Sequence, residues 1–71
     1  MDKESKLRKA RLRKGLSVAA LSRATGLHPT TIFELEAGRR YAYPKYRELL
    51  SEELGVSEEE LFGKREKRSS S

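Results

Sequence analysis

Hydrophobic residues recur at intervals of three or four positions along most of this chain, and no stretch keeps a strict alternation of apolar and polar residues. Such spacing is typical of helices that bury one face and expose the other. Five Gly and two Pro divide the chain into short segments. Because Gly and Pro mark helix ends and turns, the pattern predicts an all-α fold, a compact bundle of five helices.

The first helix is predicted over about residues 3–14. Leu7 and Ala10 share one face with the aliphatic stem of Arg11, so this face is expected to pack inward. Gly15 stands where a helix commonly ends.

A second helix is predicted to start after Ser17, whose hydroxyl can cap the free N–H groups of the first turn. Leu16 and Leu21 are spaced for a hydrophobic contact across this start, and Gly26 ends the helix. Its buried face is predicted to consist of Ala20, Leu21 and Ala24.

The third helix is predicted to open at Pro29, because proline has no N–H to leave unpaired at the first helical position. Ile32 and Leu35 are spaced to face the core, and Gly38 ends the helix. Residues 39–43 are expected to form a loop.

Two more helices complete the predicted bundle. The fourth covers residues 44–54, with inward side chains at Tyr46, Leu50 and Leu54. The fifth is marked by a capping box, in which Ser57 and Glu60 satisfy each other's backbone N–H groups. Val56 and Leu61 can form a hydrophobic contact across this start.

The composition restricts the possible functions. The 71 residues are expected to form one domain over residues 1–63, followed by a disordered basic and Ser-rich tail over residues 64–71. Cys is absent and His28 is the single histidine, so no metal site is expected, and so small a domain leaves little room for a catalytic cleft. We therefore expect neither enzyme activity nor a cofactor. The charged N-terminus and the absence of a long apolar run favour a cytoplasmic location.

Charge is distributed unevenly along the chain. Residues 1–14 carry seven basic and two acidic residues, whereas residues 44–63 carry two basic and six acidic residues. The net charge of the whole chain is +5. A basic first part suits a polyanion such as nucleic acid, although the same pattern also serves solubility alone.

The second and third predicted helices are joined at Gly26 by a turn of about three residues, which is the pattern of a DNA-binding helix-turn-helix and also of an ordinary helical hairpin. The segments LRKARLRKGLSVAALSRATGLHPTTIFELEAGRR and LLSEELGVSEEELF resemble the phage repressor and Cro (XRE-like) class of helix-turn-helix domains. The resemblance rests on the ordered set of Leu7, Arg11, Gly15, Leu16, Ser17, Leu21, Gly26, Ile32, Leu35, Glu36, Gly38, Leu54, Gly55 and Val56.

This resemblance implies a lambda-repressor-like bundle that binds double-stranded DNA as a sequence-specific transcriptional regulator, expected to be a repressor. The third helix, about Pro29–Ala37, is expected to lie in the major groove. Relatives tend to dimerise through the region that corresponds to Glu48–Phe62. A homodimer through the fourth and fifth helices is therefore expected, with Leu61 and Phe62 available for the contact.

Four residues of the third helix are candidates for reading bases. The resemblance implies this role for Pro29, Thr30 and Glu34. The Glu34 carboxylate can accept a hydrogen bond from the cytosine amine, and Thr30 can hydrogen-bond a base or phosphate or touch a thymine methyl group. Phe33 can contact the same methyl group if it is exposed, or else pack on a neighbouring helix.

The resemblance also implies a partly buried salt bridge between Arg11 in the first helix and Glu36 in the third. A carboxylate beside Ile32 and Leu35 needs a charge-assisted partner, because unpaired burial costs several kcal/mol. The alternative is that Glu36 is a solvated surface charge.

The other candidates are expected to contact phosphate groups. The resemblance implies a clamp after the third helix, made by Arg39, Arg40, Tyr41, Tyr43 and Lys45. As an alternative, one of these two tyrosines fills the core, as Tyr46 is expected to do. Weaker phosphate candidates are Ser17, Arg23, His28 and Thr31. His28 is otherwise a weak helix cap or an incidental surface residue, and Thr31 otherwise only helps the helix to start.

The chain departs from the family at several positions, so altered or lost DNA binding stays open. Many members carry Gln at the position of Val18, and polar amides where this chain has Pro29, Thr30 and Glu34. One rival function is the antitoxin of a toxin–antitoxin pair, which represses its own operon. Another is a protein-interaction module that binds polymerase or another regulator through its acidic helices. A steep salt dependence of binding would favour DNA over this module.

Overall fold

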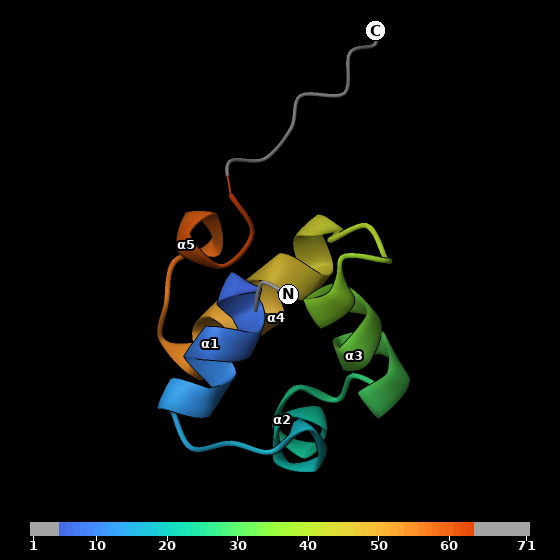
Figure 1. Cartoon of the computed structure of the whole chain (residues 1–71), viewed down its shortest axis with the longest axis vertical. Coiled ribbons are helices and arrows are strands. Elements are labelled where there is room, and N and C mark those ends of the chain that lie inside the picture. Colours follow the sequence, from blue (N-terminus) through green and yellow to red (C-terminus); the bar gives the residue numbers. More distant parts are fainter. Residues whose placement is uncertain (1–4, 64–71) are drawn as a thin grey trace, which may run out of the picture.

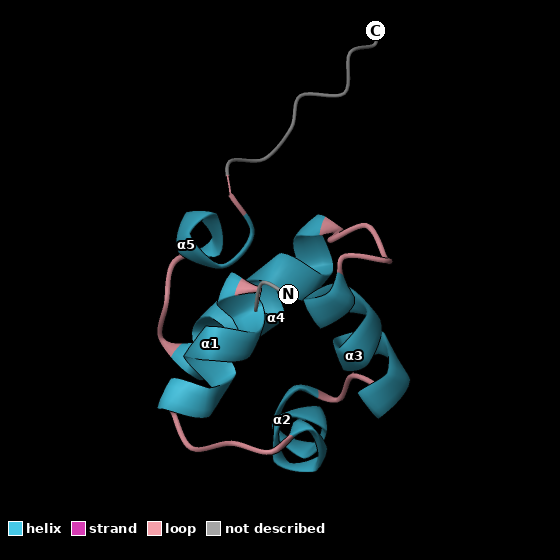
Figure 2. Cartoon of the chain, in the orientation of Figure 1, coloured by secondary structure: helices cyan, strands magenta, loops and turns pink. Residues whose placement is uncertain are grey.

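A computed structural model of the chain describes residues 5–63. The helices are α1 (Lys6–Arg13), α2 (Val18–Thr25), α3 (Pro29–Ala37), α4 (Pro44–Leu54) and α5 (Glu58–Phe62) (Figure 1). No strand occurs within residues 5–63 (Figure 2), so the predicted all-α fold is confirmed. The predicted tail, residues 64–71, lies outside the described residues, as do residues 1–4.

α1 starts later than the sequence predicts. Ser5 has an extended backbone, and its Oγ accepts a hydrogen bond from the Arg8 N–H at 3.1 Å. Ser5 is therefore the N-cap, and the helix begins at Lys6 rather than at Lys3. Periodicity alone does not reveal this start, because Leu7 is the first residue of the buried stripe.

Side chains cap the starts of α2 and α3. Ser17 Oγ accepts a hydrogen bond from the Ala20 N–H at 3.0 Å, as predicted. Pro29 lies at the start of α3, and His28 Nδ1 accepts from the Thr30 N–H at 3.1 Å. His28 is thus a helix cap and not an incidental surface residue, because an imidazole nitrogen can replace the usual hydroxyl acceptor.

The bounds of α4 agree with the predicted ones, and α5 starts after the predicted cap, Ser57. α4 begins at Pro44 and ends before Gly55, which has a left-handed φ of 68°. At α5, Ser57 Oγ accepts from the Glu60 N–H at 3.1 Å. The first turn of this helix holds three acidic residues at the positive end of the helix dipole, namely Glu58, Glu59 and Glu60.

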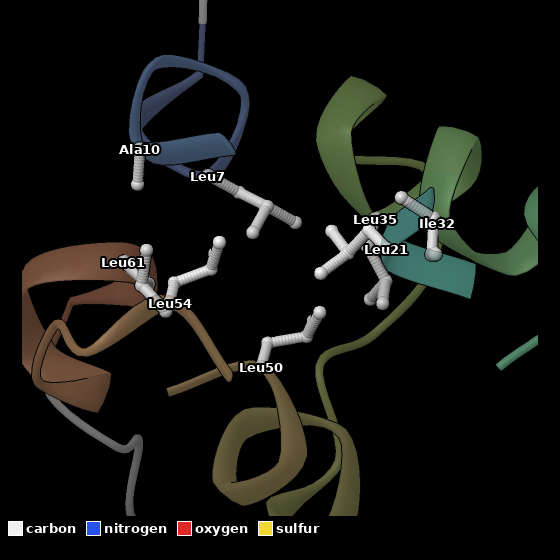
Figure 3. Packing of buried hydrophobic residues seen from close by; sticks show 8 residues of the cluster. All are labelled: Leu7, Ala10, Leu21, Ile32, Leu35, Leu50, Leu54 and Leu61. Carbon is white, nitrogen blue, oxygen red and sulfur yellow. The ribbon is translucent and has the colours of Figure 1, made fainter. Parts of the chain in front are cut away.

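The core is made by eight buried side chains, with at least one from every helix (Figure 3). α1 and α4 occupy the middle of the bundle, with α5 on one side and with α2 and α3 on the other (Figure 1). The buried residues are Leu7, Ala10, Leu21, Ile32, Leu35, Leu50, Leu54 and Leu61. In so small a core, truncation of a single leucine costs about 2–5 kcal/mol.

The buried face of α2 is narrower than predicted. Only Leu21 is fully buried, whereas Ala20 is half-buried and Ala24 is exposed. The inward stripe follows Val18, Leu21 and Thr25, at positions i, i+3 and i+7, which leaves Ala24 facing solvent.

A second buried arginine, Arg47, joins α4 to α5. Its Nε donates to Glu58 Oε1 at 3.2 Å, and its Nη2 donates to the Gly63 carbonyl at 2.6 Å. The guanidinium carbon lies 5.4 Å from the centre of the Phe62 ring. The sequence did not reveal this role, although Arg47 stands three residues before Leu50 and shares its face.

The turns that follow α2 and α4 are built alike. Ser22 Oγ donates to the Leu27 carbonyl at 2.6 Å, and Ser51 Oγ donates to the Val56 carbonyl at 2.7 Å. Four residues after each serine, a glycine adopts the left-handed conformation, with φ of 81° and 68°. These bonds fix the direction in which the next helix leaves the turn.

Candidate nucleic-acid interface

The turn between α2 and α3 sets the position of α3. Thr25 Oγ1 donates to the Leu21 carbonyl at 2.8 Å and accepts from the Leu27 N–H at 3.2 Å. Gly26 has φ of 81°, a conformation that glycine adopts without strain. Leu27 packs against the core, so the chain enters α3 in a fixed direction.

α3 buries one face and exposes the other. Ile32 and Leu35 lie in the core, whereas Thr30, Phe33 and Ala37 follow one exposed row at i, i+3 and i+7. Phe33 is 55% exposed, so the alternative that it packs on a neighbouring helix is wrong. We refer to Thr30, Phe33, Ala37 and the partly exposed Glu34 as the outer face of α3.

The inner side of α3 is tied to α1 by Arg11 and Glu36. Arg11 Nε donates to Glu36 Oε2 at 2.6 Å, and Arg11 Nη2 donates to Oε1 at 3.3 Å. Arg11 Nη1 also donates to the Leu16 carbonyl at 2.9 Å. The side chains are only 7% and 6% exposed, so the pair is a buried one and Glu36 is not a solvated charge.

Glu34, for which the sequence indicates no partner, is paired with Arg40. Its Oε1 accepts a hydrogen bond from Arg40 Nε at 2.8 Å and lies 2.6 Å from Arg40 Nη2 in the ion pair. The hydrogen bond from Arg40 to Glu34, with a smaller contribution from Tyr46, raises the pKa of Arg40 above its ordinary value. Gly38, with φ of 75°, ends α3 and starts the turn that leads to Arg40.

Two tyrosines extend the exposed surface into the loop between α3 and α4. The Tyr41 and Tyr43 rings meet edge to face with centroids 4.7 Å apart, and Tyr43 lies 6.1 Å from Tyr46. Tyr41 and Tyr43 are exposed, so neither fills the core, whereas Tyr46 packs against it. Arg39 and Lys45 are also exposed and add positive charge to this surface.

A family model described as helix-turn-helix matches residues 7–61 of the chain. The chain belongs to the helix-turn-helix family. The resemblance to Cro and phage repressors is thereby confirmed, and the general function is that of a DNA-binding transcription regulator. Comparisons with curated proteins and with solved structures gave no match.

In this helix-turn-helix domain, α3 is the second helix of the motif, the one that reads DNA in such proteins. The weaker phosphate candidates lie at the starts of α2 and α3 or along α2. Ser17, Arg23 and His28 are exposed, whereas Pro29 and Thr31 are half-buried. Ser17 and His28 already use an acceptor atom to cap their helices.

The α4–α5 side of the helix-turn-helix domain is acidic. Its exposed side chains include Glu48, Glu52, Glu59 and Glu60. Leu61 is 4% exposed, and Phe62 is half-buried against Arg47. The expectation that Leu61 is available for dimer contacts is wrong, because its side chain lies in the core, whereas Phe62 keeps part of its ring exposed.

Within residues 5–63, no helix is long and apolar enough to cross a membrane. The same residues contain no cluster of three side chains suited to hold a metal ion.

Proposed function

We propose that this domain is a sequence-specific transcriptional repressor that places α3 in the major groove of double-stranded DNA. The observation that carries the proposal is the contrast between the two sides of α3. The inner side is fixed by the core and by the Arg11–Glu36 pair, whereas the outer face is open to solvent. A helix held so firmly can enter a groove without rearranging, which keeps the ordering cost of binding low.

The outer face of α3 carries groups that suit base edges. Thr30 offers a hydroxyl and a methyl group, and the exposed Phe33 ring suits a thymine methyl group. Pro29 precedes them at the start of the helix and is half-buried, so it offers a smaller apolar contact.

Phosphate contacts are assigned to the loop after α3 and to the start of α4. Arg39 and Lys45 supply charge, and the exposed Tyr41 and Tyr43 hydroxyls can hydrogen-bond phosphate oxygens. Ser17, Arg23, His28 and Thr31 are secondary candidates at the edge of this surface. Such contacts provide affinity and register without reading sequence.

Two copies are proposed to bind a pseudo-palindromic site, with recognition helices about 34 Å apart. The α4–α5 side is the proposed dimer contact, but its exposed glutamates repel a second copy in solution. We therefore expect a monomer in the free state and two copies on a palindromic duplex. Sedimentation that shows one copy per palindromic duplex at saturation would contradict the dimer.

Selection from a pool of random duplexes at near-physiological salt tests the proposed function. We expect enrichment of an inverted repeat whose binding is weakened by Thr30→Ala and left unchanged by Leu12→Ala, a control at an exposed position of α1 outside both proposed contact surfaces. Failure to enrich any sequence, even at low salt, would contradict DNA reading. That result would instead favour a protein-interaction module that works through α4 and α5.

A further inference from the structure

The Glu34–Arg40 pair lies on the outer face of α3. Glu34 stands one helical turn after Thr30, and Arg40 follows six residues later in the sequence. The left-handed Gly38 ends the helix, and the Arg39 N–H donates to the Glu34 carbonyl at 2.9 Å. This turn lets the Arg40 side chain return to α3.

The pair differs from the Arg11–Glu36 pair in its exposure to solvent. The Arg40 and Glu34 side chains are 37% and 36% exposed, against 7% and 6% for Arg11 and Glu36. An ion pair this exposed contributes little to stability, so folding alone does not account for it. Because Arg40 neutralises Glu34, the outer face of α3 does not repel phosphate as a lone carboxylate would.

The geometry leaves one edge of the Arg40 guanidinium directed away from Glu34. Nε donates to Glu34 Oε1 at 2.8 Å, Nη2 lies 2.6 Å from the same oxygen in the ion pair, and Tyr46 is a lesser side-chain partner of the guanidinium. The other edge carries the Nη1 hydrogens and the second Nη2 hydrogen. That edge has the spacing of O6 and N7 of guanine in the major groove. Since Glu34 fixes the plane of the guanidinium, less freedom is lost when this edge binds.

We propose that Arg40 reads a guanine in each half-site and that Glu34 is a positioning residue for Arg40. This inference rests on the proposed placement of α3 in the major groove. It replaces two roles expected from the sequence, in which Arg40 holds phosphate and Glu34 accepts from cytosine. Both accounts select a G·C pair, but they contact different bases of that pair.

A base analogue separates the two accounts. In the selected duplex, the guanine of each candidate G·C pair is replaced by 7-deazaguanine, which lacks the N7 acceptor but keeps base pairing and the cytosine amine. A bidentate pair discriminates against the wrong base by about 1–3 kcal/mol. The analogue removes one of the two hydrogen bonds, so about half of that free energy is expected to be lost. The wild-type affinity should therefore fall by about 2- to 12-fold. Arg40→Ala is expected to bind both duplexes equally. A wild-type protein that is insensitive to the analogue at every candidate position would overturn the inference.

Three variants test the roles of charge and of position. Arg40→Lys keeps the positive charge but lacks the planar fork, so its guanine preference is expected to be weaker than that of the wild type. Arg39→Ala removes the neighbouring exposed arginine, so it is expected to weaken all sequences equally and to reduce the salt slope by about one. Glu34→Ala is expected to weaken the guanine preference although Arg40 is present, and an unchanged preference would overturn the positioning role. Thermal unfolding of each variant checks that the fold is kept.

The outcomes distinguish this inference from the proposed function. If the wild-type protein enriches no sequence, the proposed function fails and the role of Arg40 fails with it. If the wild-type protein enriches a site and Arg40→Ala keeps every base preference, only the role of Arg40 fails.

Discussion

Replacement of Glu36 by alanine is expected to remove a large part of the stability of this domain. The Glu36 carboxylate accepts from Arg11 at 2.6 Å and 3.3 Å, and both side chains are less than a tenth exposed. Without the carboxylate, the charge of Arg11 stays buried and unpaired, which costs about 3–5 kcal/mol. A domain of 71 residues has only about 4–10 kcal/mol of total stability, at the usual amount per residue.

Thermal unfolding followed by circular dichroism measures this effect. At about 4–8 °C per kcal/mol for a domain of this size, Glu36→Ala should lower the Tm by at least about 12 °C. Arg11→Met should lower it further, because the Leu16 carbonyl then also loses its donor at 2.9 Å. The double variant Arg11→Met/Glu36→Leu replaces the pair with apolar side chains, so it should be less destabilised than the sum of the single variants.

The exposed Glu34–Arg40 pair provides the control. Glu34→Ala should lower the Tm by no more than a few degrees, because an exposed ion pair contributes little. Equal effects of Glu36→Ala and Glu34→Ala would refute the argument from burial. A double-variant cycle with no coupling between Arg11 and Glu36 would refute it as well.

Three further predictions concern other contacts of the fold. Arg47→Met should destabilise the domain by about 2–4 kcal/mol, because it removes the hydrogen bonds to Glu58 and Gly63. Amide hydrogen exchange should speed up most in residues 58–63, and unchanged exchange there would contradict the prediction. Ser22→Ala and Ser51→Ala should each cost about 1–3 kcal/mol in chemical denaturation, since each leaves a carbonyl without its donor, and two neutral variants would contradict the shared role of these turns. Gly26→Ala should cost about 1–2 kcal/mol from its φ of +81° alone, because an added Cβ meets no atom within 4 Å; a larger loss would indicate a clash that the structure does not contain.

Local signals in the sequence are sufficient to place α2 to α5. Ser17 and Ser57 cap α2 and α5 as predicted, and Pro29 and Pro44 are the first residues of α3 and α4. Gly26 ends α2. Each of these signals acts within one helical turn, so a single sequence shows it without any knowledge of the tertiary structure.

Pairings that depend on how helices pack could not be predicted in the same way. From the sequence alone, a charged residue such as Arg47 is expected to be exposed to solvent. It is buried because α5 brings the Glu58 carboxylate and the Gly63 carbonyl to its guanidinium. Phe33 has the hydrophobicity of a core residue, yet its position on α3 turns it outward.

The candidate site shows the same division between local and tertiary information. The sequence predicts that α3 carries Thr30 and Glu34 on one side and Glu36 on the other, because helical geometry fixes those directions. The contact between Glu34 and Arg40 depends on the path of the chain after Gly38, which the residue pattern does not specify. The sequence therefore predicted which side chains share the outer face of α3, but it did not predict that Glu34 is paired with Arg40.

The central claim is that the outer face of α3 contacts duplex DNA, and an NMR titration tests it most directly. Isotope-labelled protein is titrated with a duplex obtained by selection, and the backbone amide shifts are followed residue by residue. The account predicts the largest shifts in residues 29–41, with smaller shifts in α4 and α5 where the two copies meet on the duplex. Largest shifts in α4 and α5, with α3 unaffected, would contradict it.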